Sequence, residues 1–318
     1  MHALLIGAGQ LGSRHLQGLA GAESLTSFSV IEPSAASRKV AESRFAEIDA
    51  AAAKPLRFIE NATLPTETTA PDYAVLATGA KHRLPTLQTA LGLGVKRLLC
   101  EKVLFPSIAE YRAGMQLVEN AGADARVSHI MRYVPLYQNL RAQLAQNPAP
   151  LTMEITGGEA GMGCNLIHYL DLFQFITGHA VRTLQCRIAH PVLPSKRGAD
   201  YIEFTGEAEA ETAEGDRFHL NFHAGSSALP TIEIRFGSQH YRISEGKDQW
   251  SCVTDDTAGP LEFPFMSGLS GRIFQDILAG HSPLPTLAEC FEVNRMMLNA
   301  FNAQLHETYD EHTHCPIT

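Results

Sequence analysis

The chain has 318 residues, of which 45% are hydrophobic and 19% charged, and its formal net charge at pH 7 is −9. This length accommodates two domains with substantial cores. The negative charge argues against nucleic-acid or anionic-membrane partners, which require clustered lysine and arginine side chains. No apolar run approaches membrane-spanning length, and the first expected strand begins too early to leave room for a signal peptide. The six cysteines form no Cys-x-x-Cys pair, so we expect reduced thiols and a cytoplasmic location.

A glycine-rich turn follows the first expected strand, residues 4–6, and precedes an expected helix. Its glycines have the spacing G-x-G-x-x-G. Gly7 permits a tight turn, Gly9 lets a pyrophosphate approach the backbone, and Gly12 allows the helix to pack closely on the strand. The amide groups at the start of a helix also bind anions. We therefore assign cofactor binding to Gly7, Gly9, Gln10, Leu11 and Gly12.

An acidic residue ends the second expected strand, residues 27–31. Glu32 lies about 20 residues after Gly12, the spacing typical of a dinucleotide site. Its carboxylate can accept hydrogen bonds from the ribose hydroxyls of an adenosine and would repel the additional phosphate of NADP. The sequence therefore favours NAD, although Arg38 and Lys39 nearby leave NADP as an alternative. The competing interpretation is that Glu32 only caps a loop.

Strands and helices alternate through the first half of the chain. We expect helices over 34–53, 84–93 and 108–120, and strands over 56–59, 73–77, 95–100 and 125–130. This alternation predicts a parallel sheet with helices on both faces, and ligands lie beyond the carboxyl ends of such strands. The polar residues that follow these strands are Thr78, His82, Glu101, Lys102 and Arg132.

The pattern changes near residue 132. A helix to about residue 146 precedes a strand at 152–156 and a helix at 165–176. Strands then follow at 183–189, 201–212, 217–223, 231–236, 240–244 and 249–253, and helices at 270–278 and 287–306. We predict an α/β protein: residues 1–131 form a Rossmann domain on a doubly wound parallel sheet, and residues 132–318 an α+β domain on an open, mostly antiparallel sheet. The open face is a candidate surface for a homodimer or homotetramer.

Several motifs, taken together, resemble those of the Gfo/Idh/MocA oxidoreductases, which include glucose–fructose oxidoreductase and inositol dehydrogenase. In chain order they are residues 7–12 with His15, Thr78 with His82, Cys100-Glu101-Lys102, residues 129–135, His168-Tyr169-Leu170-Asp171, and Asp200-Tyr201. The resemblance implies a Rossmann domain, an α/β domain with an open sheet, NAD(P), and usually a sugar or polyol substrate in the cleft between the domains.

Oxidation of an alcohol by NAD requires the hydroxyl proton to leave while the hydride moves to the nicotinamide, so the protein supplies a proton acceptor. His168 suits that task because imidazole titrates near neutral pH. Asp171, on the same helical face, would orient the ring or belong to a neighbouring contact. Lys102 would hydrogen-bond the reacting oxygen. We predict catalytic roles for Lys102, His168 and Asp171; further cofactor contacts from Thr78, His82, Glu101 and Lys102; and substrate contacts from Lys102, Arg132, Asn165 and His168.

Each role has a structural alternative. His168 would otherwise be a satisfied, partly buried histidine, Lys102 a surface lysine paired with Glu101, and Arg132 a brace for the cleft rather than a substrate ligand. Two positions also depart from the family pattern: Val103 replaces the usual proline, and Cys164 replaces the aspartate common four residues before the histidine.

The sequence therefore predicts an NAD-dependent sugar or polyol oxidoreductase, with two alternatives. The first is a non-catalytic dinucleotide- or sugar-sensing protein of the same fold, which the loss of the acid at position 164 favours. The second is an imine or double-bond reductase. We predict no metal site, since His219 with His223, and the segment 312–315, offer too few certain ligands. The basic loop 195–198 is a solvated loop or a contact for a phosphate or nucleotide on the substrate.

Overall fold

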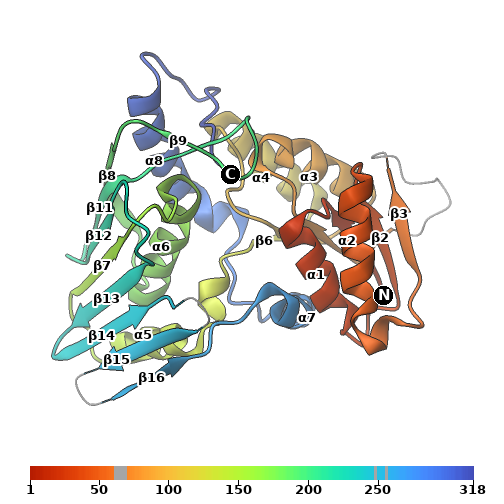
Figure 1. Ribbon diagram of the computed structural model, residues 1–318, viewed down its shortest axis with the longest axis horizontal. Helices are drawn as coiled ribbons and strands as arrows, with labels where there is room; N and C mark the ends of the chain where they lie inside the picture. The colour runs from red at the N-terminus through yellow and green to blue at the C-terminus, as the bar shows by residue number, and fades with distance from the viewer. Residues whose placement is uncertain (61–69, 247–248, 255–256) are drawn as a thin grey trace. The chain divides into compact units, whose positions relative to one another are not determined.

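The structure is a computed structural model that describes residues 1–60, 70–246, 249–254 and 257–318. These residues group into two compact units (Figure 1). The first comprises Met1–Phe105, Ala109–Ser128 and Pro264–Glu289, and the second Pro106–Ile108, His129–Phe263 and Cys290–Thr318. The single border between residues 131 and 132 stays a prediction. The structure adds that residues 264–289 pack with the first unit.

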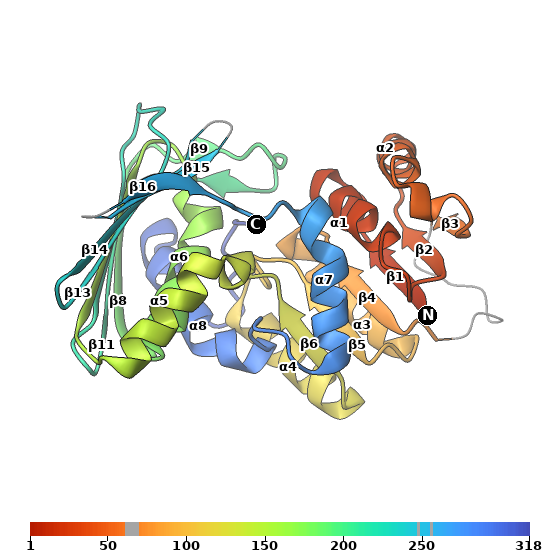
Figure 2. The same ribbon diagram turned by 90° about the horizontal axis from the view of Figure 1, so that it is seen from below.

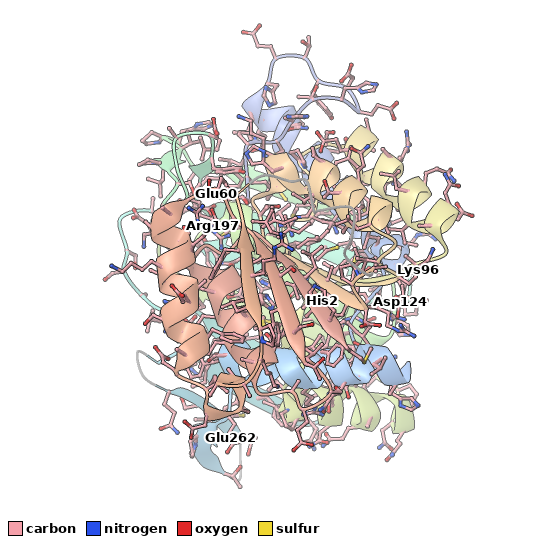
Figure 3. The ribbon with its side chains drawn as sticks, turned by 90° about the vertical axis from the view of Figure 1, so that its right-hand side faces the viewer. His2, Glu60, Lys96, Asp124, Arg197 and Glu262 are labelled. Atoms are coloured by element: carbon pink, nitrogen blue, oxygen red, sulfur yellow. The ribbon has the colours of Figure 1, made fainter. Side chains whose placement is uncertain are left out.

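The first unit is built on a parallel sheet with the strand order β3-β2-β1-β4-β5-β6. In Figure 3, His2 and Asp124 mark the first residues of β1 and β6, and Glu60 follows β3. Strand β4 is wholly buried, as expected where helices cover both faces of a sheet. The order confirms the predicted doubly wound Rossmann class. The strands are β1 (His2–Ile6), β2 (Ser27–Ile31), β3 (Leu56–Ile59), β4 (Tyr73–Leu76), β5 (Arg97–Cys100) and β6 (Asp124–Val127).

Helices cover both faces of this sheet. Right-handed crossovers run in opposite directions from β1 and from β4, so α1 and α2 lie on one face and α3 and α4 on the other (Figure 2). The helix α7 packs on α1, where a Cβ at Gly18 would lie only 2.8 Å from the carbonyl oxygen of Ser267. The helices are α1 (Gln10–Ala20), α2 (Ala35–Ala46), α3 (Arg83–Gly92), α4 (Ile108–Ala121) and α7 (Met266–Ala279).

The helix predicted over 34–53 is too long. Helix α2 ends at Ala46, and a short 3₁₀ turn follows at Asp49–Ala51. The alanine-rich composition favours a helix, but Ala51 is the only buried residue among 46–53. A segment with so little apolar surface to bury gains little from continuing the helix.

The second unit contains a mixed sheet with the order β16-β15-β14-β13-β7-β12-β11-β8. Strands β7 and β12 run parallel, and the other neighbouring pairs are antiparallel, which confirms the predicted mostly antiparallel sheet. The strands are β7 (Leu151–Gly157), β8 (Val181–Ile188), β11 (Gly206–Thr212), β12 (Arg217–Phe222), β13 (Thr231–Phe236), β14 (Gln239–Ser244), β15 (Trp250–Thr254) and β16 (Ala258–Leu261).

The strand predicted over 201–212 is two strands. Strand β10 (Ile202–Glu203) pairs with β9 (Leu193–Pro194) in a small separate sheet, and β11 begins only at Gly206. Gly206 has φ +138°, and a Cβ there would lie 2.0 Å from the carbonyl oxygen of Arg187, so the chain turns where only glycine fits. The edge strand β16 was not predicted because its Ala-Gly-Pro-Leu sequence has low strand propensity.

Helices α5 (Pro135–Gln146), α6 (Met162–Thr177) and α8 (Leu287–Leu305) lie against one face of this sheet (Figure 2). Helix α6 is buried on most of its circumference, as expected of a helix at the centre of a unit. The opposite face carries exposed ion pairs such as Arg235 with Glu154, and no helix in the described part of the chain covers it. Among the helices described, none has the length and apolarity needed to cross a bilayer.

Candidate functional site

The three glycines of the first turn are required for different reasons. Gly7 has φ +89°, and a Cβ there would lie 3.0 Å from the backbone of Ala77. A Cβ on Gly12 would lie 2.0 Å from the carbonyl oxygen of Gly7. At Gly9, by contrast, no heavy atom of the described residues outside its chain neighbours lies within 4 Å of an added Cβ. The fold itself therefore requires Gly7 and Gly12, whereas the space above Gly9 is open to a ligand.

The Glu32 carboxylate is fixed at the carboxyl end of β2. Its Oε2 accepts a hydrogen bond from the amide of Ala8 at 2.7 Å, and its Oε1 accepts one from the amide of Ser34 at 2.8 Å. Arg38, one of the two residues that leave NADP open as an alternative, donates to the backbone of Glu32 and pairs with Glu60 at 2.7 Å. The acid thus stands at the expected place, and the nearby cation already has a carboxylate partner.

A hollow of about 560 Å³ joins these parts of the first unit. Amide groups at the start of α1, a carboxylate at the end of β2 and open space above Gly9 fit a dinucleotide: the amides suit its pyrophosphate and the carboxylate its ribose. The residues predicted to bind cofactor that line the hollow are Gly7, Gly9, Glu32, Thr78 and His82. Gln10 and Leu11 begin α1, so their backbone amides lie at its N-terminus.

Arg83 was missed in the sequence. Its side chain is 1% exposed, and its guanidinium donates to the carbonyl oxygens of Leu76 and Thr78. It therefore supports the end of β4, from which Thr78 reaches the hollow. Arg83 lies just before the helix predicted over 84–93, and no local pattern there distinguishes a buried arginine from an exposed one.

Buried hydrogen bonds hold Glu101, the residue just before Lys102. The Nε2 atom of His15 lies 2.9 Å from Oε1 of Glu101, and its Nδ1 lies 3.0 Å from the hydroxyl of Ser270 on α7. All three side chains are buried, and so is Lys102, whose peptide bond to Val103 is cis. Glu101 is therefore anchored by His15 inside the unit.

Burial alone raises the pKa of Glu101, but the hydrogen bond and charge of His15, with the charge of Arg83, outweigh it and lower the pKa from 4.5 to about 2. A folded-state pKa below the unfolded value gives stability that is present above pH 4.5 and is lost as the pH falls toward 2. A shift of this size corresponds to about 3 kcal/mol.

We therefore expect Glu101→Gln to lower the free energy of unfolding at pH 7, and the gap to wild type to shrink as the pH falls below 4.5. Urea unfolding followed by circular dichroism between pH 7 and pH 3 measures this. A gap that stays constant over that range would show that the ionised carboxylate contributes nothing.

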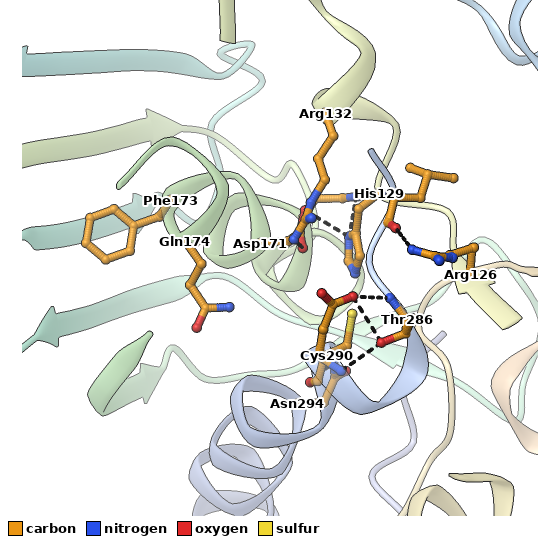
Figure 4. A network of polar contacts seen from close by, with 12 residues as sticks. Arg126, His129, Arg132, Asp171, Phe173, Gln174, Thr286, Cys290 and Asn294 are labelled. Carbon is orange, nitrogen blue, oxygen red and sulfur yellow. Dashed lines mark hydrogen bonds and ion pairs between the residues drawn. The ribbon is translucent and has the colours of Figure 1, made fainter. Parts of the chain in front are cut away.

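The second unit brings together four polar side chains. The Nδ1 atoms of His129 and His168 lie 3.3 Å apart, and their rings meet edge to face. Figure 4 shows His129 and Arg132 converging on Asp171. The two oxygens of Asp171 accept hydrogen bonds from Nε and Nη2 of Arg132 at 2.9 and 2.7 Å, and Oδ2 lies 4.0 Å from Nδ1 of His129.

These contacts refine the roles expected of Asp171 and Arg132. Asp171 is 2% exposed and engages Arg132 in a bidentate pair, a geometry that fixes both side chains. The guanidinium of Arg132 also lies 5.1 Å from the centre of the Phe175 ring. The arrangement favours the bracing alternative for Arg132, and any orienting influence of Asp171 on His168 runs through His129.

Position 164 has a carboxylate nearby after all. Glu203 of β10 accepts hydrogen bonds from the amides of Gly163 and Cys164, at 2.5 and 3.2 Å, and so caps the start of α6. The side-chain amide of Asn165 donates to the carbonyl oxygen of Ala160 at 2.7 Å. Glu203 lies 39 residues from Cys164 in the sequence, so no local spacing indicated it.

Among the described residues, two groups have potential metal-ligand atoms within 4.8 Å of one another: His129, Asp171 and Cys290; and His179, Glu214 and Asp216. Arg132 holds both oxygens of Asp171, and Asp216 accepts from His179, the amide of Leu151 and the hydroxyl of Thr212. The carboxylates of Asp171 and Asp216 therefore already have protein partners.

No protein-family model and no curated protein sequence matches the chain. Solved structures do match it. An oxidoreductase from Agrobacterium radiobacter in complex with NAD+, L-tartaric acid and magnesium has a TM-score of 0.73 at 16% identity, covering 97% of each chain. The UDP-N-acetylglucosamine 3-dehydrogenase of Acidithiobacillus ferrooxidans has a TM-score of 0.71 at 18% identity, over 94% of this chain and 96% of that one.

A scyllo-inositol dehydrogenase from Lactobacillus casei, with bound NAD(H) and scyllo-inositol, has a TM-score of 0.70 at 13% identity, over 95% of this chain and 97% of that one. The chain therefore shares the fold of these oxidoreductases and dehydrogenases. The likeness extends over both units, so the fold that the sequence motifs implied is confirmed. At these identities it is the fold that is shown, and the chemistry is argued from this chain's own residues.

Proposed function

We propose that the protein is an NAD-dependent oxidoreductase that transfers a hydride between a hydroxyl or ketone of a sugar, sugar derivative or polyol and nicotinamide. The observation that carries the proposal is the hollow of the first unit, where open space above Gly9 meets the fixed carboxylate of Glu32. Relatives in fold are described with NAD+ and tartaric acid and with NAD(H) and scyllo-inositol, both polyhydroxylated ligands.

When bound, NAD supplies the hydride acceptor. In the proposal His168 accepts the hydroxyl proton, and Lys102 donates a hydrogen bond to the same oxygen and stabilises the charge that develops there. The His15–Glu101 contact fixes the chain next to Lys102, and the Arg132–Asp171 pair fixes His129 beside His168. His15, Glu101 and Asp171 are buried and Arg132 is half-buried, and each contact anchors a neighbour of a reacting side chain.

Fluorescence titration with NADH and NADPH, followed by assays of NAD reduction with a panel of sugars and polyols, tests the proposal. We expect tighter binding of NADH, because Glu32 repels the additional phosphate, and reduction of NAD by at least one panel member. Binding of NADH and a sugar without hydride transfer would favour the sensing alternative. Products from imines or conjugated double bonds would favour the reductase alternative.

A glycine substitution separates cofactor binding from folding. We expect Gly9→Ala to change the free energy of unfolding by less than about 1 kcal/mol, because the added methyl meets open space and the backbone already has φ −61°. The same methyl should weaken NADH binding about tenfold or more, because it occupies the approach of the pyrophosphate.

Gly92→Ala is a matched control, since a Cβ there also has no described neighbour within 4 Å but lies at the end of α3. Denaturation curves and NADH titrations on both variants give the two quantities. Equal NADH affinities in the two variants would place the dinucleotide elsewhere.

We also propose that the protein is cytoplasmic and that it forms a homodimer or homotetramer through the open face of the eight-stranded sheet. That face carries alternating charges, with Arg235 between Glu154 and Glu233, and so offers both signs to a second copy. Sedimentation analysis of the wild type and of a variant with Arg235→Glu measures the contribution of this face to assembly.

A further inference from the structure

Two adjoining hollows lie beside the start of α6, within the second unit. One, of about 350 Å³, is lined by Cys164, Lys196 and Arg197 among others, and the second, of about 400 Å³, by Ser226 and Leu229. Glu159, Ala160 and Lys196 belong to both walls. Lys196 therefore lies where the two hollows meet, and each has the size of a small-molecule site.

The acidic and basic side chains around these hollows differ in whether they have partners in the protein. Glu203 accepts hydrogen bonds from the amides of Gly163, Cys164 and Phe204, and Glu159 accepts one from the amide of Gly225. Lys196 and Arg197 are exposed, and neither forms an ion pair with an acid of the described chain. The acids are thus satisfied by backbone donors, whereas the two cations remain available to an anion.

The second hollow also has an apolar wall. Leu229 is 47% exposed, and Pro230 lies beside it. The hydroxyl groups of Ser226 and Ser227 line the same hollow. A flat, weakly polar ring with hydroxylated neighbours, such as a nucleoside, matches this combination better than a bare phosphate does.

The first hollow is lined by Cys164, which lies one helical turn before the proposed proton acceptor, His168. Cys164 and His168 are four residues apart on α6, and residues with this spacing lie on one side of a helix, about 6 Å apart along its axis. A sugar whose hydroxyl reaches His168 therefore directs a substituent on its far side toward Cys164 and Lys196. An aspartate at position 164 would place a negative charge there, whereas a thiol is uncharged at its ordinary pKa.

We propose that the second unit binds a sugar carried on a nucleoside diphosphate, with the two phosphates at Lys196 and Arg197 and the nucleoside in the hollow of Ser226 and Leu229. This inference rests on the proposed function, because the reacting sugar is placed at His168. It gives the basic loop between β9 and β10 a ligand.

Calorimetric titration of UDP into the protein saturated with NADH tests the subsite, since NADH keeps UDP from the dinucleotide hollow. We expect UDP to bind the wild type, and the double variant Lys196→Gln/Arg197→Gln to bind it about tenfold more weakly or worse. The charge-matched control Arg272→Gln/Arg295→Gln, on the surfaces of α7 and α8, should bind UDP like the wild type. The affinity of the wild type should also fall with added salt.

Failure of UDP to bind the wild type, or equal binding by the loop variant, would overturn the subsite. Assays of NAD reduction with uncharged polyols separate this failure from failure of the proposed function. Hydride transfer without UDP binding would leave an oxidoreductase that lacks the nucleotide subsite. UDP binding that depends on the loop, without hydride transfer from any nucleotide sugar, would keep the subsite and refute the oxidoreductase.

Discussion

Replacing Lys102 with methionine should lower kcat/KM for the sugar or polyol substrate by about 10²- to 10⁴-fold while leaving the dissociation constant for NADH within about twofold. Methionine keeps most of the length of the side chain and removes the ammonium group. The loss then falls on stabilisation of the reacting oxygen, which matters more in the transition state than in the bound substrate. Steady-state kinetics and NADH fluorescence give the two quantities.

Lys96→Met provides the control, because Lys96 is an exposed lysine just before the same strand, β5. A double variant of Lys102→Met with His168→Gln extends the test. If both side chains act on one proton transfer, the double variant should be little slower than the slower single variant. Multiplicative losses would show that the two residues act in separate steps, and unchanged turnover in Lys102→Met would remove the lysine from the mechanism.

The sequence predicted the parts of the site whose function depends on local spacing. The glycines at 7, 9 and 12 and the acid at 32 follow a fixed pattern because one turn and two adjacent strands create the site. The structure places Gly7, Gly9 and Glu32 around one hollow together with Thr78 and His82. The parallel sheet with helices on both faces followed from the alternation of strands and helices.

The residues that the sequence analysis did not predict are those whose contacts lie on distant segments of the chain. Ser270 contacts His15, which lies 255 residues away in the sequence. Glu203 caps the start of α6 through the amides of Gly163 and Cys164, which lie 40 and 39 residues before it. Nothing in their neighbourhoods marks them, because a serine in a helix and a glutamate in a short strand are common on surfaces. Asp171 was assigned to His168 from helical spacing, whereas both of its oxygens are held by Arg132, which lies outside that helix. Spacing predicts which residues share a helix face, but it does not predict which side chain from another element binds them.

The second large effect is expected on stability, when the Arg132–Asp171 pair is broken. We expect Asp171→Leu to lower the free energy of unfolding by about 3–5 kcal/mol, because it leaves a half-buried guanidinium without its carboxylate. Asp171→Asn should cost less, since the amide oxygen still accepts one hydrogen bond. Thermal and urea unfolding of the purified variants measure both losses.

A double-mutant cycle with Arg132→Met decides what the pair contributes. If Arg132 braces the unit, Arg132→Met alone should destabilise it, and the two substitutions together should cost clearly less than the sum of the single changes. If Arg132 mainly binds substrate, Arg132→Met should raise KM and leave the unfolding free energy within about 0.5 kcal/mol. The exposed pair Arg295–Glu292 serves as the reference, because Glu292→Gln should change stability by less than about 1 kcal/mol.

His129 lies against both Asp171 and His168. A bracing role therefore also predicts that Asp171→Asn alters the pH dependence of kcat, whereas a purely local structural role leaves that profile unchanged.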